Sequence, residues 1–115
     1  MSNDCLFCNL LADGKFNLLY EDTLAVAFVD VEPKAPVHII IIPRQHIASV
    51  NEVEETDEAV LGHLFSVAKT IAQQKNVNNS GYRLSVNTES DAGQTVHHLH
   101  IHLLAGGKLG HMNSE

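Results

Sequence analysis

Three histidines alternate with apolar residues near the end of the sequence, as His98-Leu99-His100-Ile101-His102. Successive side chains of a β-strand point to opposite faces, so the three imidazoles would share one face of such a strand. They would lie ~6.5–7 Å apart along it. Such a row could hold the oxygens of a phosphoryl group, bind a metal ion, or form a plain polar surface. Three alternating histidines are a costly choice for a plain surface, so we favour a chemical role.

A polar loop directly before these histidines contains groups suited to an anion. Asn87 ends the polar face of the preceding predicted strand, and Gly93-Gln94-Thr95 follow in the loop. A glycine-containing turn can direct backbone N–H groups at an anion, and the threonine hydroxyl adds a donor. Together with the histidine row, this loop predicts a phosphate-binding site.

A carboxylate, Asp30, follows Leu24, Val26 and Phe28 on one face of another predicted strand. A carboxylate at that place can accept two hydrogen bonds from ribose hydroxyls, as the acidic residue of dinucleotide sites does. The other interpretation is a capping or loop charge.

Two cysteines, Cys5 and Cys8, form a C-x-x-C pair near the start of the chain. In a reducing compartment such a pair is a redox pair, half of a metal site, or two incidental thiols. The remaining histidines, His63, His97 and His111, are predicted to be structural or surface residues.

Composition narrows the class of protein. The 115 residues fit one domain, and 44% apolar with 18% charged residues is an ordinary globular composition. The net charge of −7 argues against a non-specific nucleic-acid binder, which normally has a basic face. The apolar runs, such as residues 39–43, are too short to cross a bilayer, and no secretory pattern is visible. We expect a cytoplasmic single domain (residues 1–115) with no nucleic-acid or membrane partner.

The elements that must position these groups follow from periodicity and turn residues. Residues 37–42 are apolar on both faces, which is typical of a central strand. Strands outnumber helices and little sequence separates them, so we predict an α+β fold with an antiparallel sheet. The predicted elements are a helix over 5–12 and strands over 17–21, 24–31, 37–42, 82–87 and 98–104.

One long helix is predicted over residues 56–76. Thr56 is a plausible N-cap, and Asp57 and Glu58 suit the positive end of the helix dipole. Its apolar stripe at three- and four-residue spacing consists of Val60, Leu61, Leu64, Phe65, Ala68, Ile71 and Ala72.

These features together resemble the histidine triad (HIT) family, over residues 5–112. The resemblance rests on the alternating histidines followed by two apolar residues, on Asn87, on Gly93-Gln94-Thr95-Val96, and on Ala35-Pro36-Val37-His38 followed by Ile-Ile-Pro-Arg. The sequence is most similar to the nucleotide-binding branch of purine nucleoside phosphoramidases. The resemblance implies a five-stranded antiparallel sheet with one short and one long helix, and a homodimer whose sheets join side by side.

The resemblance also implies roles for individual residues. His100 would be the nucleophile, a role that suits neutral imidazole. His102 would hydrogen-bond the phosphoryl group and deliver a proton, with His38 beside it and His98 completing the triad. The purine pocket would be lined by Leu6, Phe7, Leu10, Phe28 and Val29. The phosphate would be held by Asn87, Gly93, Gln94, Thr95 and Val96.

Some family members with this cysteine pair hold a structural zinc ion. Here Cys5, Cys8, His46 and His98 would supply two thiolates and two imidazoles, an acceptable tetrahedral set. The alternative is a pair of packed thiols. We expect no cofactor to be required for catalysis.

The sequence therefore predicts a hydrolase that cleaves the P–N bond of nucleoside 5'-phosphoramidates, such as adenosine phosphoramidate or AMP-lysine, through a nucleotidyl-histidine. One alternative is a non-catalytic nucleotide-binding sensor or scaffold. Another is a metal-dependent hydrolase that uses the histidine face as its metal site, although no carboxylate lies in that strand.

Overall fold

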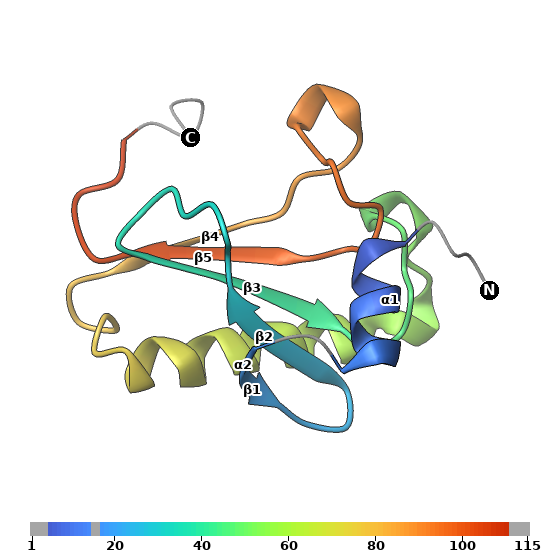
Figure 1. Cartoon of the computed structure of the whole chain (residues 1–115), viewed down its shortest axis with the longest axis horizontal. Coiled ribbons are helices and arrows are strands. Elements are labelled where there is room, and N and C mark those ends of the chain that lie inside the picture. The colour runs from blue at the N-terminus through green and yellow to red at the C-terminus, as the bar shows by residue number, and fades with distance from the viewer. Residues whose placement is uncertain (1–4, 15–16, 111–115) are drawn as a thin grey trace.

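The computed structural model describes residues 5–14 and 17–110, and their element order is the one predicted (Figure 1). His111 and the end of the expected 5–112 core lie outside the described residues. The helices and strands are α1 (Leu6–Asp13), β1 (Leu18–Glu21), β2 (Ala25–Val29), β3 (Val37–Pro43), α2 (Glu58–Gln74), β4 (Tyr82–Ser85) and β5 (Ile101–Ala105). Short 3-10 helices cover Val50–Glu52, Glu55–Asp57 and Ser90–Ala92.

The strands form one antiparallel five-stranded sheet in the order β1-β2-β3-β5-β4, which confirms the predicted fold class. β3 is central and buried along almost its whole length, as its uninterrupted apolar sequence predicts. β1 and β4 are the edge strands of the described sheet.

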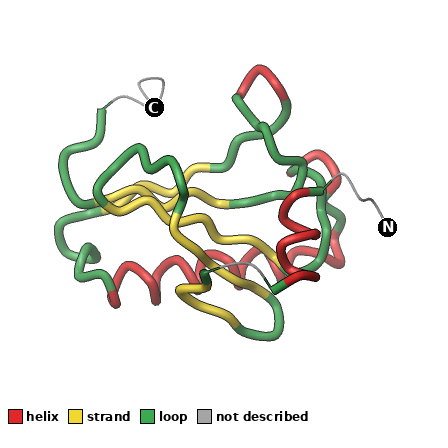
Figure 2. The backbone as a smooth tube through the Cα atoms, in the orientation of Figure 1, coloured by secondary structure: helices red, strands yellow, loops and turns green. Residues whose placement is uncertain are grey.

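Alternation along β2 and β3 separates two apolar layers. Ala25 and Ala27 belong to the larger core under α2, whereas Val26 and Phe28 pack with α1 on the opposite face. α2 runs along one face of the sheet, and α1 lies at one end of it (Figure 1). The connections at 30–36 and 86–100 rise above the strands in Figure 2. The second face, only partly covered by α1, is therefore open to a ligand.

The predicted start of α2, residue 56, is two residues too early. Residues 55–57 form a 3-10 turn, and Thr56 is not the cap. Instead Glu54 and Asp57 form a reciprocal capping box, in which the Glu54 N–H donates to the Asp57 carboxylate at 3.0 Å. The Asp57 carboxylate also accepts from Gln45 at 3.0 Å, and these bonds account for its burial.

The apolar stripe of α2 is also shifted from the prediction at one position. Phe65 was expected in the core but is 51% exposed, and Val67 is buried. Both residues fit a three- or four-residue spacing, so periodicity alone could not choose between them.

The last strand begins at Ile101, three residues later than predicted. The ladder between β3 and β5 runs from Val37↔Ala105 to Ile41↔Ile101, and two more steps would place Leu99 opposite Pro43. Pro43 has no N–H to donate, and the Leu99 N–H bonds to the Ile47 carbonyl at 2.7 Å instead. His98 and His100 therefore lie in irregular backbone that leads into β5.

Within the described part of the chain, neither helix has the length and apolar character that a membrane span needs.

Candidate functional site

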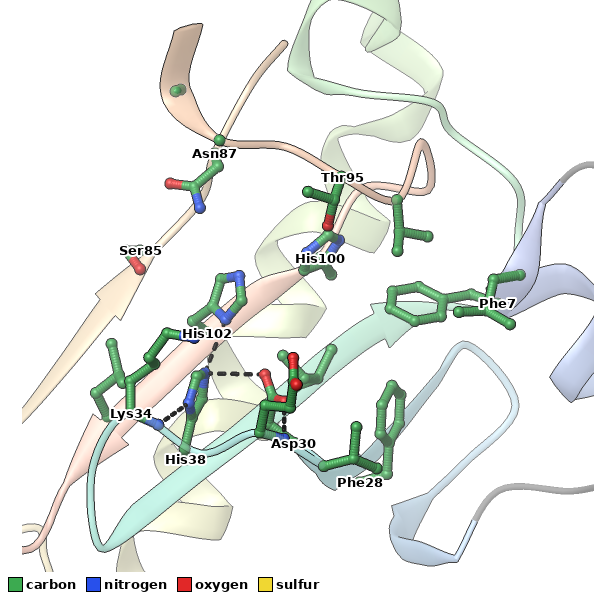
Figure 3. Close-up of a pocket in the computed structure, with 18 of the residues that line it drawn as sticks. Phe7, Phe28, Asp30, Lys34, His38, Ser85, Asn87, Thr95, His100 and His102 are labelled. Atoms are coloured by element: carbon green, nitrogen blue, oxygen red, sulfur yellow. Dashed lines mark hydrogen bonds and ion pairs between the residues drawn. The ribbon is translucent and has the colours of Figure 1, made fainter. Parts of the chain in front are cut away.

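A cavity of about 840 Å³ opens on the face of the sheet that carries α1 (Figure 3). Its walls come from α1, the ends of β2 and β3, the loop over 30–36, β4, β5 and the 86–96 loop. It is lined by Leu6, Phe7, Leu10, Phe28, Asp30, Val31, Glu32, Lys34, His38, Ile40, Ser85, Asn87, Ala92, Gly93, Thr95, Val96, His100, His102 and Leu104. Most of the residues predicted to bind a nucleotide therefore lie around one cavity.

The buried His100 ring has a defined tautomer. Its Nδ1 lies 2.7 Å from the backbone carbonyl oxygen of His98, so Nδ1 bears the proton and Nε2 keeps a lone pair. Burial lowers the pKa of His100, and the hydrogen bond to His98 opposes part of that shift. His100 is thus neutral at pH 7, the state in which imidazole is a nucleophile.

A chain of hydrogen bonds ends at His102. The Lys34 N–H donates to His38 Nδ1 at 2.9 Å, so His38 carries its proton on Nε2. That Nε2–H donates to His102 Nδ1, also at 2.9 Å, which assigns the His102 proton to Nε2. All these donors point in the same direction, so each bond polarises the next.

Asp30 lies at the edge of this chain. Its Oδ1 accepts from the Glu32 N–H at 2.8 Å, and its Oδ2 lies 3.4 Å from His38 Nε2. By residue type, Asp30, His38 and His102 could hold a metal ion. The tautomer of His38 opposes this, because the nitrogen nearest the other two groups bears a proton and Nδ1 accepts from Lys34. The cluster is better suited to passing hydrogen bonds than to binding a metal.

Aromatic and aliphatic side chains form the other end of the cavity. The Phe7 ring packs edge-on against Phe28, with ring centroids 5.5 Å apart, and against His100, at 5.2 Å. α1 presents Phe7 to the sheet because Cys5 caps its first turn and Gly14 ends it with a positive φ. Figure 3 shows Phe7 and Phe28 facing the cavity on the side away from Lys34. This slot suits a flat apolar ring.

Two residues predicted to bind the nucleotide do not line the cavity. Val29 is 53% exposed, because strand alternation points it away from the face of Phe28. Gln94 is buried and its side chain braces the loop. Its amide accepts from the Glu89 N–H at 2.8 Å and donates to the carbonyls of Ala48 and Val96.

The Gly93 turn also differs from the expected anion-binding loop. Gly93 has a φ of 86°, which glycine adopts at little cost. The N–H groups of Gly93 and Gln94 bond within the turn, to the Ser90 and Glu89 carbonyls. Thr95 lines the cavity, with its hydroxyl on the side of His100 in Figure 3. The threonine, and Asn87 across the cavity, are therefore the donors of this loop region that can face a ligand.

The sequence analysis missed three polar residues of the cavity, Glu32, Lys34 and Ser85. Ser85 pairs with His102 in the β4–β5 ladder, so it lies beside the histidine row. Its alternation with Leu84 indicated a polar face, but only the strand register shows which residue it faces. Lys34 had no local pattern that would distinguish it from other loop lysines.

A second cluster lies beyond the cavity, between α1 and the end of β3. His98 Nδ1 lies 3.4 Å from the sulfur of Cys5 and 3.4 Å from that of Cys8, and Cys8 Sγ lies 3.2 Å from His46 Nδ1. His98 Nε2 donates to the Pro43 carbonyl at 2.8 Å, so the Nδ1 lone pair faces the sulfurs. The structure therefore brings the predicted zinc ligands together and turns His98 towards them instead of towards the cavity.

The donor chemistry of this cluster fits zinc. The four ligand atoms lie within 4.8 Å of one another, and two sulfurs with two imidazole nitrogens match a closed tetrahedral site. Burial, followed by the neighbouring Cys5 thiol, raises the pKa of Cys8 to about 11. The thiol would therefore ionise readily only beside a cation, which a bound metal ion supplies.

Comparisons with known proteins agree with this geometry. The profile of the HIT domain matches residues 14–109. The purine nucleoside phosphoramidase of Escherichia coli K12 is 46% identical over 113 residues, which cover 97% of this chain and 95% of that protein. A HIT family hydrolase from Clostridium thermocellum has a TM-score of 0.91 at 39% identity and covers 96% of each chain. One from Legionella pneumophila has a TM-score of 0.88 at 41% identity, covering 92% of this chain and 96% of its own. The chain therefore belongs to the HIT domain family.

Proposed function

We propose that this protein hydrolyses purine nucleoside 5'-phosphoramidates to a nucleoside monophosphate and an amine. The observation that carries the proposal is the hydrogen bond from His100 Nδ1–H to the His98 carbonyl, which leaves a nucleophilic Nε2 on a buried neutral ring in the cavity. The likeness to the phosphoramidase of Escherichia coli supports cleavage of a P–N bond.

The nucleotide would lie along the cavity with its base between Phe7 and Phe28. Asp30, half-buried and with few competing contacts, would accept hydrogen bonds from the ribose hydroxyls. The α-phosphoryl group would then lie beside His100 and His102, with Asn87 and Thr95 as further donors.

In the first step, His100 Nε2 attacks phosphorus, the N–P bond forms and the bond from phosphorus to the amine nitrogen breaks. The departing nitrogen takes a proton through His102 Nε2 from the hydrogen-bonded His38–His102 pair, which enters this step with one proton more than its neutral form and leaves it neutral. In the second step, water attacks phosphorus and breaks the N–P bond to His100. The proton released by that water returns to His102, so the net reaction consumes one water.

Two structural features accompany this function in the proposal. A zinc ion held by Cys5, Cys8, His46 and His98 would brace α1 and the backbone before β5, and would need no open coordination position. The protein would act as a homodimer joined along the sheets, as the family resemblance implies.

Hydrolysis of adenosine 5'-phosphoramidate tests the function. Wild type should release AMP and ammonia, and His100→Ala should reduce kcat by ~10³-fold or more because the covalent path is lost. The Kd for AMP should stay within a few-fold of wild type. His97→Ala, at an exposed position beside the triad, is the control. AMP binding with turnover no faster in wild type than in His100→Ala would instead identify a nucleotide-binding sensor or scaffold.

A further inference from the structure

The cavity extends beyond the phosphoryl position, away from the base slot. Phe28 pairs with Ile40, and Ile40 with His102, across the central strands. His38 pairs with Leu104, two residues further along β5, so this pair marks the other end of the cavity. The amine that leaves phosphorus would occupy this end, because the base would fill the opposite end of the cavity.

Two polar side chains at this far end have no partner among the described residues. Lys34 forms no ion pair there, and its side chain extends from the 30–36 loop towards His102 in Figure 3. Ser85 is 8% exposed, yet no hydrogen bond is found for its hydroxyl within residues 5–14 and 17–110. Its hydroxyl contacts the cavity, since Ser85 both lines it and pairs with His102. No side-chain polar atom among the described residues is both fully buried and unpaired, so the Ser85 hydroxyl is open to the cavity, where a ligand or water can bond to it.

We propose that Lys34 and Ser85 form a leaving-group subsite that binds a carboxylate on the departing amine. The preferred substrates would then be nucleoside phosphoramidates of amino acids with a free carboxylate. This inference rests on the proposed hydrolase function and names its substrate class.

The charges around the cavity favour a carboxylate at this position. Among the described residues that line the cavity, Lys34 is the one lysine or arginine, and Asp30 and Glu32 are the acidic residues. Asp30 lies beside His38, on the route to the ribose position, so it does not neutralise a charge next to Ser85. A carboxylate can accept from an ammonium and a hydroxyl at once, whereas a carboxamide at the same place lacks the charge.

The preferred test compares two substrates that differ only in this group, adenosine 5'-phosphoramidates of 3-aminopropanoate and of its carboxamide. The quantity to measure is the kcat/KM for the acid divided by the kcat/KM for the amide. Lys34→Gln should lower this ratio by about three- to tenfold relative to wild type, the range for a partly exposed charge-assisted contact. Ser85→Ala should lower the ratio less, and Lys34→Glu should lower it further still. The intrinsic difference between the two amines cancels when variants are compared.

Lys69→Gln removes the same charge from an exposed position on α2 and should keep the wild-type ratio. High salt should reduce the ratio in wild type more than in Lys34→Gln, since salt screens an exposed charge. Equal ratios in wild type, Lys34→Gln and Lys34→Glu would overturn the subsite while the enzyme remains active. Failure of wild type to hydrolyse plain adenosine 5'-phosphoramidate would overturn the proposed function, and the subsite with it.

Discussion

The chemistry of the site depends on which nitrogen of each histidine bears the proton, and backbone groups make that choice. The His98 carbonyl fixes His100, and the Lys34 N–H fixes His38 and, through it, His102. Because these partners are backbone groups, substituting side chains outside the site does not remove the hydrogen bonds that set the tautomers. Irregular backbone before β5 is what allows His98 to present its carbonyl to a ring two residues later.

The sequence identified most of the reacting residues at this scale because motifs are local. His100, His102 and Asp30 lie at positions where residue type and alternation predicted chemistry, and all of them line the cavity. Gln94 and Ser85 show what local motifs do not predict. The amide of Gln94 bonds to Ala48, 46 residues away, and Ser85 faces His102 through strand pairing. Neither contact has a local pattern.

At the same scale, Asp30→Ala should weaken AMP binding by ~1.5–3 kcal/mol, as expected for hydrogen bonds to a charged group. Affinity for 2',3'-dideoxy-AMP should change much less, because that ligand lacks the hydroxyls. Calorimetric titration of both ligands into both proteins measures the difference. Equal losses for the two ligands would show that Asp30 acts through His38 and not on the ribose.

Among the elements, the hairpin of β1 and β2 packs on α2 in the apolar core and is also linked to it through one carboxylate. Asp22 accepts from Tyr20 at 2.7 Å, lies 2.6 Å from His63 Nε2 on α2, and caps the turn through two backbone N–H groups. Burial opposes ionisation, but these hydrogen bonds outweigh it and hold the pKa of Asp22 well below its usual value. His63, predicted to be structural, joins the helix to the sheet.

Asp22→Asn should therefore lower the free energy of unfolding by ~1–3 kcal/mol at pH 7. The folded-state pKa is depressed, so this stabilisation is present above the unfolded value of 3.8 and is lost as the pH falls below it. Urea unfolding of wild type and variant between pH 7 and pH 3 should show the two curves converging. Asp91→Asn, at an exposed position, is the control. A difference that stays constant down to pH 3 would contradict the role of the charge.

The proposed zinc site, which would attach α1 to the rest of the fold, leads to a prediction about metal content and stability. Purified protein should contain about one zinc per chain, and chelation should lower Tm by roughly 10 °C or more, because a closed site contributes to folding. The rate of hydrolysis, measured at a temperature where the metal-free protein is still folded, should change little. Cys5→Ser with Cys8→Ser should have the same low Tm and not respond to the chelator. Zinc-free protein with an unchanged Tm would identify the cysteines as packing residues.

Element types followed from the sequence more reliably than element ends. Alternation predicted which side chains of β2 share a face, because successive residues of a strand point to opposite sides of the sheet. The start of β5 did not follow, since the ladder stops where Pro43 cannot donate. Nor did the orientation of Phe65, which depends on where α2 rests on the sheet.

For the whole molecule, an exposed phenylalanine and an unpaired edge strand suggest a second copy. Phe65 projects from α2, and β4 has no partner strand on its outer side among the described residues. We expect sedimentation equilibrium to give twice the mass of the 12.6 kDa chain. Phe65→Glu should raise the dimer dissociation constant at least ~10-fold, since it places a charge in an apolar contact.

Val31→Glu, an exposed apolar residue at the cavity on the other face, should leave that constant unchanged. A wild-type protein that sediments as a monomer at all concentrations would contradict the dimer.

The most direct test of the central claim is detection of the covalent intermediate. Wild-type protein mixed in excess with adenosine 5'-phosphoramidate, quenched rapidly at alkaline pH and digested, should yield a peptide containing residues 98–102 with one adenylyl group on His100. The group should appear before AMP and then decay, because the intermediate forms and is consumed. Release of AMP in a single turnover with no adenylylated peptide at any time, or with the group on another residue, would contradict His100 as the nucleophile.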